Sequence, residues 1–166
     1  MIIISDTTPL IAFLRVNRLD ILGRMFGTVV IPQKVLDEIH GKPEQDCEAK
    51  IIRECSFIEV VPVSNQQAVS ILMLSSNLDG GESEAIVLTK ELEATTLLID
   101  ERKGRKIAES LGLNIMGTVG VLINGSLNGI LSPVNAIDLI DQMRSSGIRI
   151  SEKVYLQAVQ RLMGLK

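Results

Sequence analysis

The sequence has very few aromatic side chains and a single histidine. Its 166 residues include no Trp, one Tyr and three Phe, and the one histidine is His40. A histidine metal cluster is therefore excluded, and a Ser-His-Asp or Cys-His catalytic centre would have to use His40. Stacking of bases on an aromatic platform has few side chains available. The chemistry of this protein must rest on other groups.

Cysteine is also scarce, and no stretch has the pattern of an export signal or a membrane span. Cys47 and Cys55 lie eight residues apart, which is typical of reduced thiols in a cytoplasmic protein. The N-terminal MIIISD has no basic region before its apolar run, so we expect a strand and not a signal peptide. Residues 110–137 carry no charge, yet their glycines, asparagines and proline favour a buried strand, turn and helix. We expect a cytoplasmic protein that does not contact a membrane.

Length and composition predict one folded domain over residues 1–166. The chain is 46% apolar and 22% charged, which supplies enough side chains for a core. Domains of this size are common, and division into two is rare. The net charge of −3 gives the whole protein no long-range attraction for phosphate, so any contact with nucleic acid has to be local.

Short apolar runs alternate with helical patterns along most of the chain. The strand-length runs are 2–5, 28–31, 57–61, 95–99 and 114–116. The helical patterns are 9–22, 33–40, 47–55, 65–76, 82–92 and 102–111, then 118–124, 134–145 and 152–163. A short loop is expected at 41–46. This alternation predicts an α/β fold with a mainly parallel central sheet, helices on both faces and a helical C-terminal tail.

Two aspartates directly follow strand-length runs. Asp6 follows the first run and Asp100 follows the fourth. In an open parallel sheet, ligands bind beyond the carboxyl ends of the strands, where the first and fourth strands could lie side by side. Each aspartate also precedes a helix, so capping of that helix is the alternative role for either residue.

Further acidic residues lie near the starts of two helices. Glu38 borders the apolar stripe of the helix that starts at Pro32, and an exposed charge is its alternative role. Glu82 and Glu84 lie in the first turn of a helix that a glycine pair precedes. Because residues two apart on a helix point in different directions, at most one of these two faces a given site. The alternative role of Glu82 is favourable interaction with the helix dipole.

Four converging carboxylates would favour one kind of chemistry. Like charges within a few ångströms repel and raise one another's pKa unless a cation neutralises them. Oxygen ligands suit Mg²⁺ or Mn²⁺, which take further ligands from water and phosphate. Such a centre polarises the phosphorus and activates a metal-bound water for in-line attack, and it requires no histidine.

Four stretches occur in a fixed order between residues 5 and 122: SDTTPLIAF, VVIPQKVLDEI, DGGESEAIVL and LLIDERKGRKIAESLGLNIMGTVGVL. Together they resemble the PIN-domain ribonucleases, within them the prokaryotic branch similar to VapC toxins. The resemblance implies a single PIN-like domain, built as a three-layer α/β/α sandwich with C-terminal helices over 132–164. It also implies an acidic pocket for Mg²⁺ or Mn²⁺, cleavage of single-stranded RNA, an antitoxin partner and a homodimer.

The resemblance assigns roles to individual residues. The catalytic acids are Asp6, Glu38, Glu82 and Asp100, of which Asp6, Glu82 and Asp100 hold the metal. Supporting positions are Ser5 and Thr7, whose hydroxyls could orient a metal-bound water, together with Glu84, Glu101 and Thr118. Thr118 is also the expected N-cap of the helix that follows it. Better characterised toxins of the family usually have an aspartate where this chain has Glu82, and often a further acid shortly after the fourth-strand one, where only the adjacent Glu101 stands.

A basic segment follows Asp100 directly. It comprises Arg102, Lys103, Arg105 and Lys106. These side chains could hold the RNA phosphates that flank the scissile bond, with Arg102 and Arg105 as the pair that acts together. A solvated helix face is the alternative interpretation.

We therefore expect a metal-dependent endoribonuclease that is the toxin of a toxin–antitoxin pair. Two other functions stay open. One is a noncatalytic PIN-like module that binds RNA or a protein. The other is aspartyl phosphoryl transfer, which would want a second aspartate two positions after the nucleophile, where Thr8 stands. Apolar stripes on the C-terminal helices provide further core and a surface for partners.

Overall fold

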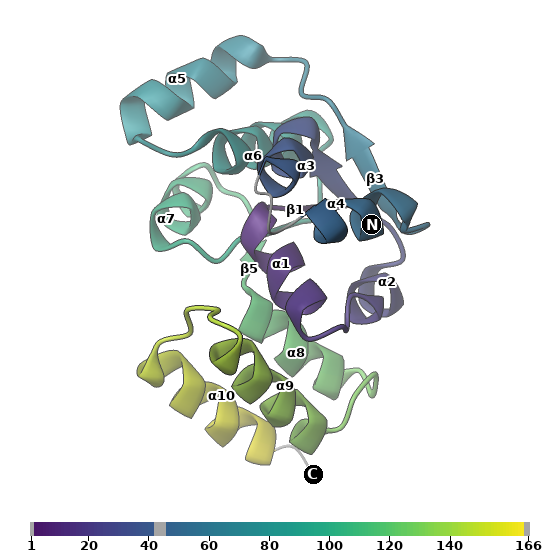
Figure 1. Ribbon diagram of the computed structural model, residues 1–166. Helices are drawn as coiled ribbons and strands as arrows, with labels where there is room; N and C mark the ends of the chain where they lie inside the picture. Colours follow the sequence, from purple (N-terminus) through teal and green to yellow (C-terminus); the bar gives the residue numbers. More distant parts are fainter. Residues whose placement is uncertain (1, 42–45, 165–166) are drawn as a thin grey trace.

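The computed structural model describes residues 2–41 and 46–164, so most of the expected loop at 41–46 lies outside the described residues. Five strands form one sheet in the order β3-β2-β1-β4-β5, and every neighbouring pair is parallel (Figure 1). The strands are β1 (Ile3–Ser5), β2 (Val29–Pro32), β3 (Ile58–Val61), β4 (Thr96–Leu98) and β5 (Ile115–Met116). This sheet confirms the predicted α/β class.

Helices cover both faces of the sheet. They are α1 (Thr7–Arg15), α2 (Asp20–Phe26), α3 (Gln33–His40), α4 (Asp46–Glu54), α5 (Gln66–Ser76), α6 (Gly80–Glu91), α7 (Arg102–Ser110), α8 (Thr118–Leu127), α9 (Pro133–Ser145) and α10 (Glu152–Met163). Successive strand residues point to opposite faces. Ile3 therefore packs in the core shared with α1–α4 and α8–α10, whereas Ile4 packs in the core shared with α5–α7. These layers match the expected three-layer sandwich.

The helix expected over residues 9–22 is in fact two helices, so this prediction is wrong. Asn17 adopts a left-handed conformation with φ of 54°. Its N–H donates to the Leu14 carbonyl at 2.9 Å, and the Arg18 N–H donates to the Phe13 carbonyl at 2.9 Å. Such bonds satisfy the last carbonyls of a helix, and asparagine tolerates the left-handed conformation. The chain therefore leaves α1 and starts α2 in a new direction.

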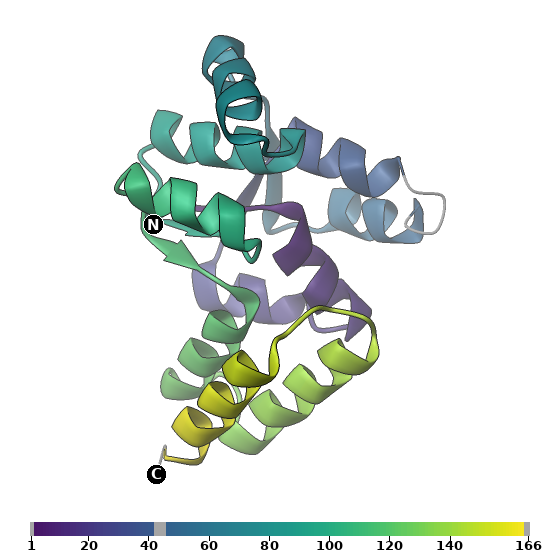
Figure 2. The same cartoon turned by 90° about the vertical axis from the view of Figure 1, so that its left-hand side faces the viewer.

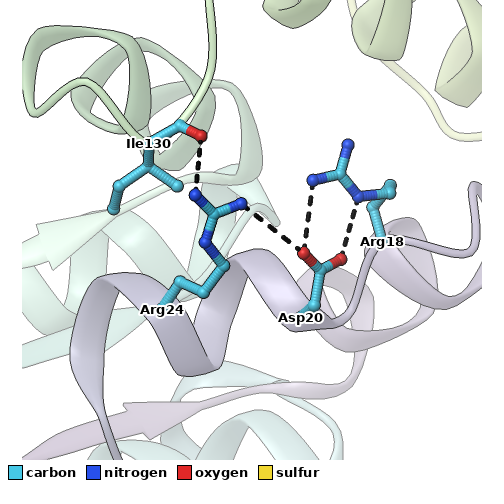
Figure 3. Close-up of polar contacts among 4 residues, drawn as sticks. All are labelled: Arg18, Asp20, Arg24 and Ile130. Carbon is cyan, nitrogen blue, oxygen red and sulfur yellow. Dashed lines mark hydrogen bonds and ion pairs between the residues drawn. The ribbon is translucent and has the colours of Figure 1, made fainter.

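The C-terminal helices α8, α9 and α10 gather at the end of the molecule that carries the C-terminus (Figure 2). Their buried side chains, such as Leu139 and Leu162, belong to the same core as Ile3. Polar bonds add to this attachment. Arg24 of α2 donates to the Ile130 carbonyl at 3.0 Å and also approaches Asp20, which pairs with Arg18 (Figure 3). The tail is therefore fixed on the sheet domain.

Not all of the apolar tail is covered. Val134 on α9 is 70% exposed and Leu156 on α10 is 57% exposed. Within residues 2–41 and 46–164, none of the helices combines the length and apolar character needed to cross a membrane.

Candidate acidic site

The sheet topology brings the ends of the first and fourth strands together, as predicted. Strand β1 pairs with β4, with Ser5 opposite Leu98, and the Asp6 N–H donates to the Leu98 carbonyl at 2.9 Å. The chain passes from β1 to β2 on one side, whereas β4 and β5 lie on the other. Ligands of open parallel sheets bind beyond the strand ends at such a reversal of strand order. Asp6 and Asp100 follow these two neighbouring strands.

Asp6 is a buried carboxylate in an acidic environment. Its side chain is 3% exposed and makes no capping hydrogen bond to α1, so the capping alternative is not realised. Burial raises the pKa of Asp6 well above its usual value, although the Thr7 backbone N–H partly offsets this. The negative charges of Asp79, Glu82 and Glu38 raise the pKa further. We call these four residues the acidic cluster.

Glu38 of α3 is held through both of its carboxylate oxygens. Oε2 accepts a hydrogen bond from the Thr7 hydroxyl at 3.0 Å, and Oε1 accepts one from the Gly81 N–H at 2.8 Å. A side chain at position 81 would collide with Oε2, so glycine is needed for this approach of α6 to α3. Burial, followed by the charge of Asp79, raises the pKa of Glu38. The Ser5 hydroxyl instead donates to the Asp6 backbone carbonyl at 2.9 Å.

Asp79 and Glu82 form a capping box at the start of α6. Asp79 Oδ1 accepts from the Glu82 N–H at 2.8 Å, and Glu82 Oε2 accepts from the Asp79 N–H at 3.2 Å. The helix therefore begins at Gly80 and not at Glu82, and the glycine pair lies within its first turn. The other oxygen, Glu82 Oε1, is buried and has no hydrogen-bond partner among the described residues. Burial, then the charges of Asp79 and Glu101, raise the pKa of Glu82.

Asp79 belongs to the acidic cluster but was not predicted from the sequence. The signal was present as the Asp-x-x-Glu spacing of residues 79–82, which is typical of a capping box. The box places the Asp79 charge next to Glu38 and Glu82 and raises the pKa of both.

Glu84 points away from Glu82, as the helical geometry predicts. It is 9% exposed, and its Oε2 accepts a hydrogen bond from the Lys34 N–H at 3.1 Å. Lys34 lies in the first turn of α3, where a carboxylate interacts favourably with free N–H groups. The two glutamates of α6 therefore accept hydrogen bonds from different backbone groups, Glu82 from Asp79 and Glu84 from Lys34.

Asp100 is bound to the start of α8. Its Oδ1 accepts from the Thr118 N–H at 2.8 Å, and its Oδ2 accepts from the Thr118 hydroxyl at 2.5 Å. The N-cap position belongs to Gly117, so the expectation that Thr118 is the N-cap is wrong: its hydroxyl serves Asp100. Burial raises the pKa of Asp100, whereas the bonds from Thr118 and the charge of Arg105 lower it. Within the described residues, the charge that acts on Asp100 is thus a positive one.

The donor chemistry of the acidic cluster fits a hard divalent cation. A cation would relieve the like-charge repulsion that raises the pKa values of Asp6, Glu38 and Glu82. Glu82 Oε1 is a buried oxygen that is free to bind a cation, and a Cβ atom at Gly104 would stand only 3.0 Å from it. Within the described ranges, no three His, Cys, Asp or Glu side chains are grouped closely enough to hold an ion. Metal binding would therefore require the carboxylates to move toward one another.

A groove of about 1180 Å³ opens beside Asp100. Arg102 and Arg105, the predicted phosphate-binding pair, both line it. Arg102 is exposed, whereas Arg105 is half-buried and donates to the Ile99 carbonyl at 2.9 Å. Lys103 instead donates to the Asn77 carbonyl at 3.1 Å and does not line the groove. Within the basic segment, Lys103 and Arg105 thus bond to backbone carbonyls, whereas Arg102 is exposed to solvent.

Comparison with known proteins agrees with this architecture. No curated protein matches the chain. A PIN-domain family, DUF3368, matches residues 2–163, which include all five strands and the ten helices described above. The chain therefore belongs to the PIN-domain family DUF3368.

Proposed function

We propose that this protein is a nuclease that cleaves single-stranded RNA with the help of Mg²⁺ or Mn²⁺. PIN domains are generally nucleases, and they typically use divalent metals. The observation that carries the proposal is the acidic cluster at the carboxyl ends of the parallel strands. Burial and like charge raise the pKa values of Asp6, Glu38 and Glu82 together there. Such groups are typical of sites that bind cations or move protons.

In this proposal Asp6, Glu82 and Asp100 hold the cation. Once bound, a divalent ion would neutralise the carboxylates and polarise a phosphodiester. The chain itself orients the acids: Asp79 fixes Glu82 through Oε2, and Thr118 fixes both oxygens of Asp100. Glu82 Oε1 remains free to face the ion.

Glu38 is the proposed general base. The raised pKa of Glu38 lies closer to neutral pH than that of an ordinary glutamate, which favours transfer of a proton from an attacking water. Thr7 and Gly81 hold its two oxygens, so the group is oriented before substrate arrives. Glu101 contributes a further negative charge beside Glu82.

The decisive experiment compares Asp6→Asn with Asp37→Asn. Asp37 lies on the same helix as Glu38, is exposed, and accepts a hydrogen bond from the Gln33 side chain at 2.8 Å. Cleavage of an end-labelled single-stranded RNA in Mn²⁺ should fall at least about a hundredfold in Asp6→Asn and stay unchanged in Asp37→Asn. Equal cleavage by wild type and Asp6→Asn, or cleavage that persists in EDTA, would refute the proposal.

We further propose a VapC-like toxin that works in the cytoplasm as a homodimer and is bound by an antitoxin protein. Val134 and Leu156 are exposed apolar side chains suited to such contacts, and Cys47 and Cys55 are free thiols. Light scattering at micromolar concentration should show a dimer. Light scattering that shows only monomer would contradict this part of the proposal.

One observation favours a noncatalytic RNA-binding module instead. Each oxygen of Asp100 already accepts a hydrogen bond from Thr118, which leaves fewer of its lone pairs for a cation. Calorimetry with Mn²⁺ on wild type and on the double variant Asp6→Asn, Asp100→Asn separates the two functions. A nuclease should bind Mn²⁺ in wild type alone, whereas a noncatalytic module should give the same result for both proteins.

A further inference from the structure

The groove beside Asp100 has two positively charged sides. One side is α7, which contributes Arg102 and Lys106, four residues apart and therefore on one helix face. The other side is the C-terminal tail, which contributes Arg149 before α10 and Arg161 near its end. Figure 1 shows α7 and α10 on the same side of the molecule. We call the space between them the cationic groove.

These four cations are not used inside the protein. All four are exposed, and none makes an ion pair or a side-chain hydrogen bond within residues 2–41 and 46–164. The basic side chains near α2 differ, because Arg18 pairs with Asp20 at 2.9 Å and Arg24 bonds to Ile130 (Figure 3). The groove therefore gathers positive charge that lacks a partner.

Acidic residues do not balance this charge. The acids that line the groove are Asp100 and Glu109, against five basic residues when Arg105 is included. A protein of net charge −3 thus concentrates positive charge in one place. Such a groove attracts anions locally even when the whole protein does not.

We propose that the cationic groove holds the phosphates of a single-stranded RNA segment next to the cleavage site, with the C-terminal tail supplying half of the contacts. This inference rests on the proposed function, because the strand is the substrate of the nuclease whose proposed metal-binding acids include Asp100. A volume of about 1180 Å³ exceeds the usual range of small-molecule pockets, roughly 300–1,000 Å³. It suits several nucleotides of a chain.

Continuity with Asp100 favours a polynucleotide over an acidic protein segment. Asp100 lines one part of the groove, so a strand held there would bring a phosphodiester beside Asp100, one of the proposed metal-binding acids. Aromatic side chains do not occur among the groove residues, which are all described. The groove therefore binds phosphates without stacking bases, and we expect oligonucleotides of different sequence to bind equally well.

The test measures RNA binding without cleavage. Fluorescence anisotropy of a labelled twelve-nucleotide oligouridine is recorded with the full chain in EDTA at several salt concentrations. The variants are Arg149→Gln with Arg161→Gln, and the same two positions changed to Lys. Lys153→Gln is the matched control, because Lys153 is an exposed cation on α10 that does not line the groove.

Each lost phosphate contact lowers the salt slope by about 0.7, which corresponds to about eightfold weaker binding at 50 mM salt. The double Gln variant should therefore bind about sixtyfold more weakly, with a slope smaller by about 1.4. The double Lys variant should retain most of the binding because it keeps the charge. Lys153→Gln should match wild type, and all four proteins should unfold at the same temperature because these side chains are exposed.

Several outcomes would overturn the inference. Binding by the double Gln variant within twofold of Lys153→Gln would do so, as would absence of RNA binding by wild type. Binding of polyglutamate in place of RNA would assign the groove to an acidic protein. Cleavage in Mn²⁺ separates this inference from the proposed function: groove variants should raise KM and keep kcat, whereas a protein that binds RNA in the groove but never cleaves it refutes only the nuclease.

Discussion

The acidic cluster and the cationic groove differ in the sign of their charged side chains and in how those side chains are held. In the acidic cluster, burial and neighbouring negative charges raise the pKa values of Asp6, Glu38 and Glu82. Hydrogen bonds from Thr7, Gly81 and the capping box hold Glu38 and Glu82 in place. In the cationic groove, four exposed basic side chains make no bonds within the described residues. The carboxylates of the acidic cluster suit a small hard cation that would draw them together, and the cationic groove suits a flexible polyanion. The net charge of −3 reveals neither arrangement.

The largest expected effect comes from disturbing the geometry of the acidic cluster alone. Gly81→Ala places a methyl group against Glu38 Oε2 and should displace that carboxylate, which lowers the rate of RNA cleavage by about a hundredfold. Gly80→Ala is the neighbouring control, since its new Cβ would meet the flexible Lys34 side chain at 2.8 Å. RNA binding in EDTA should stay the same in both variants. Equal cleavage by the two variants would show that the position of Glu38 is unimportant.

The second largest expected effect distinguishes Glu82 from Glu84, the two buried glutamates of α6. Glu82→Gln removes a charge from the acidic cluster and should slow cleavage by roughly ten- to a hundredfold. Glu84→Gln changes a group that bonds to the Lys34 N–H, so cleavage should persist while the free energy of unfolding falls by about 0.3–1 kcal/mol. Paired cleavage and urea unfolding assays measure both quantities. The assignment fails if Glu84→Gln is the less active protein.

A smaller effect concerns stability in the absence of metal. Because burial and like charge raise the pKa of Asp6, the folded state binds a proton more tightly than the unfolded state. Stability is therefore lost as pH rises from the unfolded pKa through the folded pKa, and the penalty persists above it.

Asp6→Asn removes this penalty and should stabilise the protein by about 0.5–2 kcal/mol at pH 8. The gain should shrink toward zero only below about pH 3, under the unfolded pKa of an aspartate, where Asp6 is protonated in both states. Urea unfolding in EDTA across this pH range measures it. A variant less stable than wild type at pH 8 would contradict the prediction.

The smallest effect concerns the paired cations that contrast with the groove. A hydrogen bond and ion pair with Arg18 lower the pKa of Asp20, so this pair stabilises the fold above the unfolded pKa of Asp20 and is lost as pH falls through the folded one. Asp20 is 50% exposed, and Asp20→Asn should cost less than about 1 kcal/mol at pH 7. RNA binding should not increase, because the released Arg18 and Arg24 do not line the groove. Tighter RNA binding would show that location matters less than total charge.

The fold was largely predictable because its signals are local. Each strand-length run became a strand, since buried parallel strands read as short apolar segments. The break at Asn17 was missed because the apolar pattern continues across it, while the left-handed conformation depends on a single residue.

The site was only partly predictable. The pairing of β1 with β4 followed from the strand pattern, but the partners of each acid did not. The binding of Asp100 by Thr118 spans 18 residues, and the contact between Glu38 and Gly81 spans 43. Such contacts depend on how α3, α6 and α8 pack on the sheet. The contribution of Arg149 and Arg161 to the groove depends on the same packing.

The capping box also explains why a glutamate suits position 82. An aspartate there would carry the same charge on a shorter side chain. Reaching back to the Asp79 N–H is a task for the longer glutamate side chain, and Glu82 does so with one oxygen while the other stays free. An aspartate would lose this reach. One side chain therefore both starts a helix and keeps an oxygen for the proposed cation, so a change at position 79 should alter which acids position 82 can accept.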